Sequence, residues 1–113
     1  MDESILTTIV IALGYEPELH EFDRDLIPII NSFLMALEQL GIGQDGFQIT
    51  GEDETWSDFC TDISRFAAVK TYVHLKTKLA WDPPASATVL GAMEKTVNEL
   101  EWRLNVKQEQ SQQ

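Results

Sequence analysis

The chain has 113 residues, of which 43% are hydrophobic, and a formal net charge of −11. A chain of this length forms one domain with a sizeable core. Its single cysteine, Cys60, excludes an internal disulfide. No apolar run is long enough to cross a membrane, and the N-terminus lacks the basic start of a signal peptide. We therefore expect no membrane contact and a protein made in the cytoplasm.

The charge is unevenly distributed along the chain. Residues 1–62 hold 14 acidic residues and one basic residue, a net charge of −13, whereas residues 63–113 hold five acidic and seven basic residues, a net charge of +2. Affinity for nucleic acid comes mostly from cations that release counterions from the phosphates. The composition therefore argues against ordinary DNA binding. Keeping the surface soluble is an equally simple role for the acidic residues.

Two amphipathic helices are expected in the first 41 residues. Ser4 to Leu13 carries an apolar face at helical spacing, and Gly14 can end that helix. The second helix is expected to begin at Asp23 or Asp25, either of which can cap it, with Pro28 in its first turn. Its apolar stripe has spacings of four, three, four and three residues and ends before Gly41. The stripe consists of Leu26, Ile30, Phe33, Leu37 and Leu40.

The segment 41–55, GIGQDGFQITGEDET, is expected to be a long connection. Its glycines favour turns, and the alternation in FQIT allows one short strand. Loops of this length are usually functional or mobile. The acidic run Glu52, Asp53 and Glu54 does not match a calcium loop, which has acidic residues at alternate positions. We therefore expect no bound metal there and treat the three residues as candidates for an interface.

Two further helices follow a short turn at TWSDF. The third is expected over 63–81, with an apolar arc that contains Val69, Tyr72 and Val73. The fourth is expected to open at Ser86 and to close near Asn105. Residues 107–113, which have no apolar side chain, are expected to form a disordered tail. The sequence thus predicts an all-α bundle of about four helices in one domain, residues 1–106.

Several large or charged side chains project from unexpected sides of these helices. Trp81 and Trp102 fall opposite the apolar stripes, as do His74, Lys70 and Lys78. Tryptophan on a polar face either contacts another protein or packs on a second side of its own fold. If the two rings pack within the fold, Trp81 caps the hairpin that the last two expected helices form, and Trp102 contacts the first helix.

Lys76 projects from the middle of the apolar arc of the third expected helix. A buried ammonium there needs a carboxylate partner, or it extends outward between two subunits. Lys76 and the five residues of the preceding paragraph are, with Glu52 to Glu54, the candidates for an interface.

Enzyme motifs are absent from the chain. HEFDR, residues 20–24, begins like a zinc-protease motif but lacks the second histidine four residues on. The usual phosphate loop, dinucleotide fingerprint and nucleophile elbow do not occur. We therefore expect no catalytic activity, no cofactor and no metal.

The segments TWSDF, AVKTYVHLKTKLAWDPP and NELEWRLN, in this order and after the start MDESILTTI, resemble the small α-helical head-tail connector proteins of tailed bacteriophages. The resemblance extends to about Val106 and is closest to connectors of phages and prophages of Gram-positive hosts. It implies a structural subunit of a ring, commonly a dodecamer, below the portal vertex of the capsid. It also implies contacts with the portal protein and with a further connector or tail-completion protein. DNA passes through such a ring in the virion without specific binding.

Two other classes of function stay open at this stage. A small acidic helical protein can present carboxylates in place of phosphates and inhibit a nuclease as a DNA mimic. A general helical adaptor unrelated to phages has the same composition. Binding to a nuclease favours the first, and neighbouring genes other than portal, capsid and tail genes favour the second.

Overall fold

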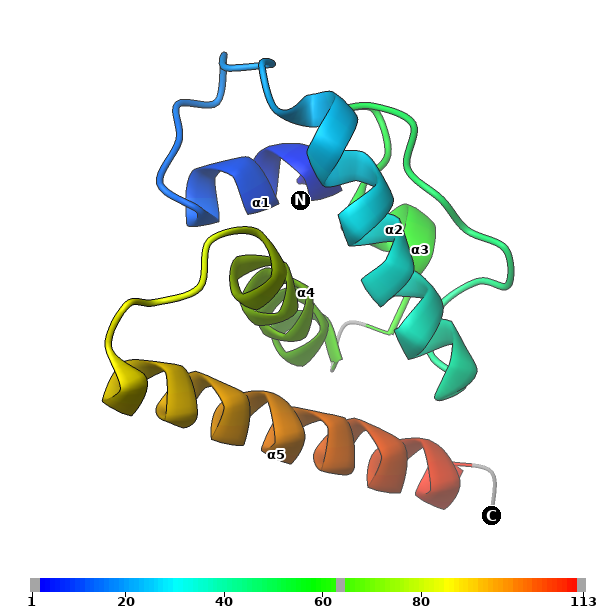
Figure 1. The fold of residues 1–113 in the computed structure, drawn as a ribbon. Helices are drawn as coiled ribbons and strands as arrows, with labels where there is room; N and C mark the ends of the chain where they lie inside the picture. Colours follow the sequence, from blue (N-terminus) through cyan, green and yellow to red (C-terminus); the bar gives the residue numbers. More distant parts are fainter. Residues whose placement is uncertain (1–2, 63–64, 112–113) are drawn as a thin grey trace.

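The structure describes residues 3–62 and 65–111, with side chains up to Asn105. This part of the chain contains helices and no strands, as the sequence predicts. This computed structural model contains α1 (Ile5–Ala12), α2 (Asp23–Gln39), the one-turn α3 (Trp56–Phe59), α4 (Phe66–Trp81) and α5 (Ala87–Ser111) (Figure 1). Helix α4 lies at the centre and packs against α1, α2 and α5, whereas α5 makes its main contacts with α4 alone. The core therefore surrounds α4.

The two N-terminal helices bury the faces that their spacing indicates, with one correction. The Ser4 side chain accepts a hydrogen bond from the amide of Thr7 and caps α1. Gly14 and Gly41 have φ angles of 95° and 86°, which glycine adopts without steric cost. On α2 the fully buried residue beside Leu37 is Leu34, whereas Phe33 is half-buried. The predicted stripe was therefore wrong by one residue at this point.

The start of α2 also differs from the prediction. Phe22 is the residue at its N-cap and makes no side-chain capping bond, so neither Asp23 nor Asp25 caps the helix. Both lie in its first turn, where their negative charge interacts favourably with the helix dipole. Because the helix begins at Asp23, Pro28 lies in its second turn and not in its first. There it removes one backbone hydrogen bond, which would have reached the carbonyl of Arg24.

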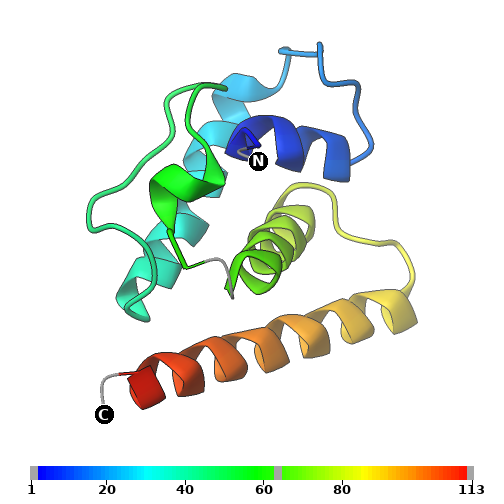
Figure 2. The ribbon, with the colours of Figure 1, turned by 180° about the vertical axis from the view of Figure 1, so that it is seen from behind.

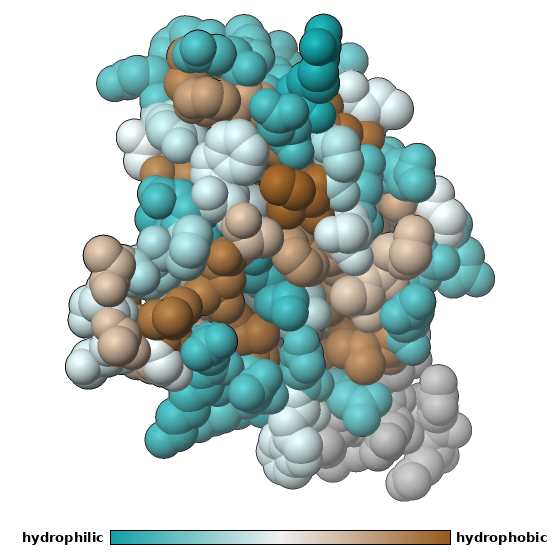
Figure 3. All heavy atoms as spheres, in the orientation of Figure 1, coloured by the Kyte–Doolittle hydropathy of each residue, from teal (hydrophilic) through white to brown (hydrophobic). Residues whose placement is uncertain are grey.

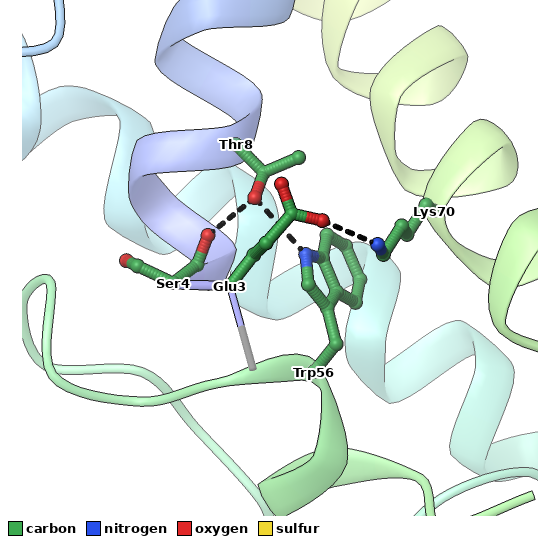
Figure 4. A network of polar contacts seen from close by, with 5 residues as sticks. All are labelled: Glu3, Ser4, Thr8, Trp56 and Lys70. Atoms are coloured by element: carbon green, nitrogen blue, oxygen red, sulfur yellow. Dashed lines mark hydrogen bonds and ion pairs between the residues drawn. The ribbon is translucent and has the colours of Figure 1, made fainter. Parts of the chain in front are cut away.

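The N-terminal segment is held against α3 and α4 by polar contacts (Figure 4). The amide of Ile5 donates to the carbonyl of Glu54, and the amide of Trp56 donates to that of Glu3. The buried indole Nε1 of Trp56 donates to Thr8 Oγ1 at 3.2 Å. Lys70 Nζ lies 2.7 Å from Glu3 Oε1. The segments around Ser4 and Thr55, far apart in the sequence, therefore lie side by side, as the view from behind also shows (Figure 2).

The long connection between α2 and α3 contains no strand at FQIT, contrary to the short strand that the alternation allowed. Instead it is attached to the core by single residues. Ile42 and Ile49 are each 1% exposed. The Asn31 side chain holds both polar groups of the Ile49 backbone, accepting from its amide at 2.8 Å and donating to its carbonyl at 3.1 Å. Mobility of the connection, residues 41–55, stays a prediction.

The last two helices, α4 and α5, pack against each other. Tyr72, 2% exposed, donates its hydroxyl to Glu101 Oε1 at 3.0 Å and so joins α4 to α5. The amide of Val89 donates to the Ser86 side chain, so α5 opens where expected. The described part of α4 begins at Phe66, and the expected start at Ile63 lies outside the described residues.

The predicted end of α5 was wrong. The helix continues to Ser111, six residues beyond Asn105, into the segment 107–113 that was expected to be disordered. The segment KQEQS contains good helix formers and neither proline nor glycine, so nothing in it stops a helix. A domain boundary at residue 106 stays a prediction.

Candidate interaction surfaces

Trp81 packs inside its own subunit. Its ring lies 5.5 Å from that of Phe22, edge to face, and its Nε1 donates to the hydroxyl of Tyr15 at 3.1 Å. Both partners belong to the connection between α1 and α2. Trp81 therefore joins the end of α4 to the first third of the chain, and a role for it in an interface stays a prediction.

The three candidate lysines of α4 also have partners within the subunit. Lys70 pairs with Glu3, and Lys78 Nζ lies 3.1 Å from Asp82 Oδ2, one turn along the chain. Lys76 Nζ lies 5.4 Å from the centre of the Phe33 ring, a distance at which a cation is attracted to an aromatic face. That contact is neither of the two arrangements expected for Lys76. Salt bridges at the surface, such as those of Lys70 and Lys78, contribute little to the free energy of unfolding.

His74 lies half-buried between α4 and the end of α1. Burial lowers its pKa, although a hydrogen bond with the backbone of Ala12 opposes that effect. The neighbouring ammonium of Lys78 lowers the pKa further. The folded protein therefore favours the neutral imidazole.

A pH dependence of stability follows from this lowered pKa. In the unfolded chain His74 titrates near 6.5, so below about pH 6.5 the unfolded state binds more protons than the folded state. The contribution of His74 to stability is present above that pH and is lost as the pH falls. We expect the unfolding free energy of the wild type, relative to His74→Gln, to decrease between about pH 7.5 and about pH 5.5 in urea titrations.

His20 provides the matched control of opposite sign. The Asp23 carboxylate, 3.0 Å from its Nδ1, raises its pKa, so its contribution is present at low pH and is lost as the pH rises. His20→Gln should therefore remove a contribution that grows on acidification. Equal pH profiles for the wild type and His74→Gln would contradict the assigned burial of His74.

The acidic candidates divide into one structural residue and two exposed ones. The carboxylate of Glu54 accepts hydrogen bonds from the amide and hydroxyl of Thr50 and closes the turn before α3. Glu52 and Asp53 are exposed. With three exposed residues of the α1–α2 connection they form what we call the acidic edge. Its members are Glu16, Glu18, Glu21, Glu52 and Asp53.

Trp102 is the most exposed large hydrophobic side chain of the described residues, at 67%. It points away from the face of α5 that packs on α4, where Val97 and Leu104 are buried. The expected alternative, a contact between Trp102 and the first helix, is therefore wrong. Around Trp102, the outer side of α5 carries Gly91, Glu94, Lys95, Asn98, Glu99 and Arg103.

The polar and apolar surfaces occupy different parts of the molecule. Both ribbon views place α5 at the end opposite the α1–α2 connection (Figures 1 and 2). On the face in Figure 3, hydrophilic residues gather at the α1–α2 connection, and hydrophobic residues gather at the seam between α4 and the first half of α5. The described side chains contain no group of three or more that could hold a metal. None of the described helices is long and apolar enough to cross a membrane.

Comparison with known families identifies the class of protein. Residues 5–111 match the family described as phage connector proteins, and the match includes every helix in Figure 1. The chain therefore belongs to the phage connector protein family. Its role is that of a structural connector in phage assembly. No curated protein and no solved structure gives a match.

The contacts that hold the candidate residues within the fold were not predicted from the sequence. Trp56 was placed in a short turn, yet it is 2% exposed and bonded to Thr8. The signal for it was present, because Thr55 and Asp58 have the spacing of a capping box and form one. Of the candidate residues, the structure thus leaves Trp102, Glu52 and Asp53 exposed, and it pairs or half-buries the others.

Proposed function

We propose that this chain is a ring subunit at the head-tail junction of a virion, where it binds the portal protein on one side. A further connector or tail-completion protein binds on the other side. The ring is a dodecamer through which DNA passes without specific binding, and it assembles in the cytoplasm of a Gram-positive host. Membership of the connector family supports this function. The proposal includes no enzymatic activity.

The observation that carries the proposal is the exposure of Trp102 on the outer side of a helix that packs only on its inner side. Exposed tryptophan is costly in water and dominates the binding energy of many interfaces. In a ring, one surface of a subunit meets a different surface of its neighbour. The outer side of α5 and the acidic edge, at opposite ends of the molecule, supply two such different surfaces.

Binding to the portal tests the function directly. Purified portal rings of the same phage are mixed with this chain and sedimented, and the complex is imaged by electron microscopy. We expect co-sedimentation and a ring of additional density with the symmetry of the portal. The absence of binding to the portal ring, together with neighbouring genes that encode no virion proteins, would remove the assignment.

The acidic residues do not favour the DNA-mimic alternative. A mimic needs carboxylates in rows that follow the phosphates of a duplex, whereas the acidic edge lies in two connections between helices. Its members are also spread over segments of irregular backbone. A nuclease inhibited by this chain at stoichiometric ratio would show that such rows are not required.

A further inference from the structure

Asp45 and Gly46 form the tip of an exposed turn in the connection between α2 and α3. The amide of Phe47 donates a hydrogen bond to the carbonyl of Gln44 at 3.3 Å and closes the turn around them. Asp45 and Gly46 are both exposed, and a Cβ atom at Gly46 would meet no atom within 4 Å. Among the described residues, no backbone carbonyl accepts a hydrogen bond from the Gly46 amide. The carboxyl group of Asp45 therefore precedes an amide nitrogen with open surroundings.

An aspartate that is followed by glycine can isomerise without an enzyme. The amide nitrogen of Gly46 attacks Cγ of Asp45 in its acid form, a C–N bond forms, and the carboxyl hydroxyl leaves with the amide hydrogen as water. Water then adds to one carbonyl of the resulting succinimide ring and breaks the C–N bond at that carbonyl. Opening on the Cα side leaves the chain linked through Cγ as isoaspartate, whereas opening at Cγ restores aspartate. Glycine favours the attack because no Cβ atom crowds its nitrogen.

The surroundings of the other described aspartates oppose this reaction. Ring closure needs a rotation of the aspartate backbone, which a helix prevents, and helices contain Asp23, Asp25 and Asp58. Asp82 precedes a proline, whose nitrogen carries no hydrogen to lose. Asp53 precedes a glutamate, whose Cβ atom crowds the nitrogen, and Asp62 is held by Arg65, whose Nε lies 3.1 Å from its Oδ2. Among the described aspartates, the surroundings of Asp45 therefore oppose the reaction least.

The turn lies between contacts that attach it to the core residue Phe59. The amide of Gln44 donates to the carbonyl of Phe59 at 3.0 Å, and the Phe47 ring lies 5.4 Å from the Phe59 ring. Gly43 lies so close to the Phe59 ring that a Cβ atom there would clash with it. Isoaspartate adds one carbon atom to the backbone between Gln44 and Phe47. The lengthened turn does not fit the two contacts, of which the contact between the rings is the weaker one.

We infer that Asp45 is a site of spontaneous isomerisation to isoaspartate in the folded chain, and that the product loses the contact between Phe47 and Phe59. Water is the only co-reactant, so the reaction needs neither a partner nor a cofactor. It takes place in the free chain and does not depend on the proposed function. A subunit that is stored before assembly thus accumulates a form with an altered connection but with the same mass.

Incubation of the purified full chain at neutral pH and physiological temperature tests this inference. Peptide mapping with electron-transfer fragmentation locates isoaspartate, and labelling by an isoaspartate methyltransferase measures its total amount. Asp45→Asn is the positive control, because its side-chain amide closes the same ring with loss of ammonia. Asp45→Glu is the matched negative control, because it keeps the charge but would need a six-membered ring, which closes far more slowly.

We expect isoaspartate to accumulate at position 45 before any other aspartate reacts, Asp45→Asn to deamidate, and Asp45→Glu to form no isoaspartate at this position. The isomerised chain, separated by anion exchange, should unfold at a lower urea concentration than the unmodified chain. Isomerisation in urea but not in the folded chain would show that the fold protects the turn, and would overturn the inference. Accumulation mainly at another aspartate would also overturn it. An unchanged urea midpoint of the isomerised chain would contradict the loss of the contact between Phe47 and Phe59.

Discussion

Replacing Leu37 with alanine is expected to lower the free energy of unfolding by about 2–5 kcal/mol. The Leu37 side chain is 0% exposed and lies in the core on the inner side of α2. Truncation removes its buried surface and leaves a cavity that the packed helices fill only partly. Equilibrium unfolding in urea, followed by helical circular dichroism, measures the change. The midpoint should fall while the slope of the transition stays the same.

Met35 supplies the matched control on the same helix. It is 49% exposed and points to solvent, so Met35→Ala should change the unfolding free energy of the isolated chain by less than about 0.5 kcal/mol. The loss of unfolding free energy caused by Phe33→Ala should lie between those of Leu37→Ala and Met35→Ala, because the Phe33 ring is half-buried beside Lys76. A melting temperature for Leu37→Ala within about one degree of the wild type would mean that α2 is wrongly oriented.

Replacing Trp102 with alanine is expected to weaken assembly on the portal by about 2 kcal/mol, roughly thirtyfold in affinity. An exposed indole loses its contact with water only when a partner covers it, so its removal affects binding and not folding. The melting temperature should therefore change little. Titration of the chain onto immobilised portal rings, with melting curves of the free protein, measures both quantities.

Trp81→Ala is the control, because it should affect folding more than binding. Its ring packs on Phe22 and bonds to Tyr15, so its loss should lower the melting temperature of the free chain. Equal binding by the wild type and Trp102→Ala would sink the interface role of Trp102. A lower melting temperature for Trp102→Ala would show that the indole packs within the subunit.

The helices were predictable because each depends on local spacing and on residues that end it. Gly14 and Gly41 lie at helix ends with backbone angles in the left-handed region. At the start of α5 the Ser86 hydroxyl accepts a hydrogen bond from the amide of Val89. The end of α5 was not predictable from apolar content. Helix propagation depends on backbone preference, and the segment after Asn105 lacks a residue that opposes it.

The contacts of the side chains that project from unexpected sides of their helices could not be predicted from the spacing within one helix. Helical spacing shows which way Trp81 and Lys76 point from α4, but not which other segment lies there. The aromatic residues Tyr15 and Phe22 cover Trp81, and Phe33 lies beside Lys76. Trp102 was predicted to lie on the outer side of its helix, and there it is 67% exposed among the described residues.

The contacts between α4 and α5 on either side of Trp102 fix the direction in which its indole points. Glu101, the preceding residue, accepts a hydrogen bond from Tyr72, and Leu104, two residues further on, is 3% exposed on the inner side of the helix. The exposed indole therefore projects from a part of α5 that is already held against the core. A partner that covers Trp102 does not have to order this helix first, which lowers the entropic cost of binding.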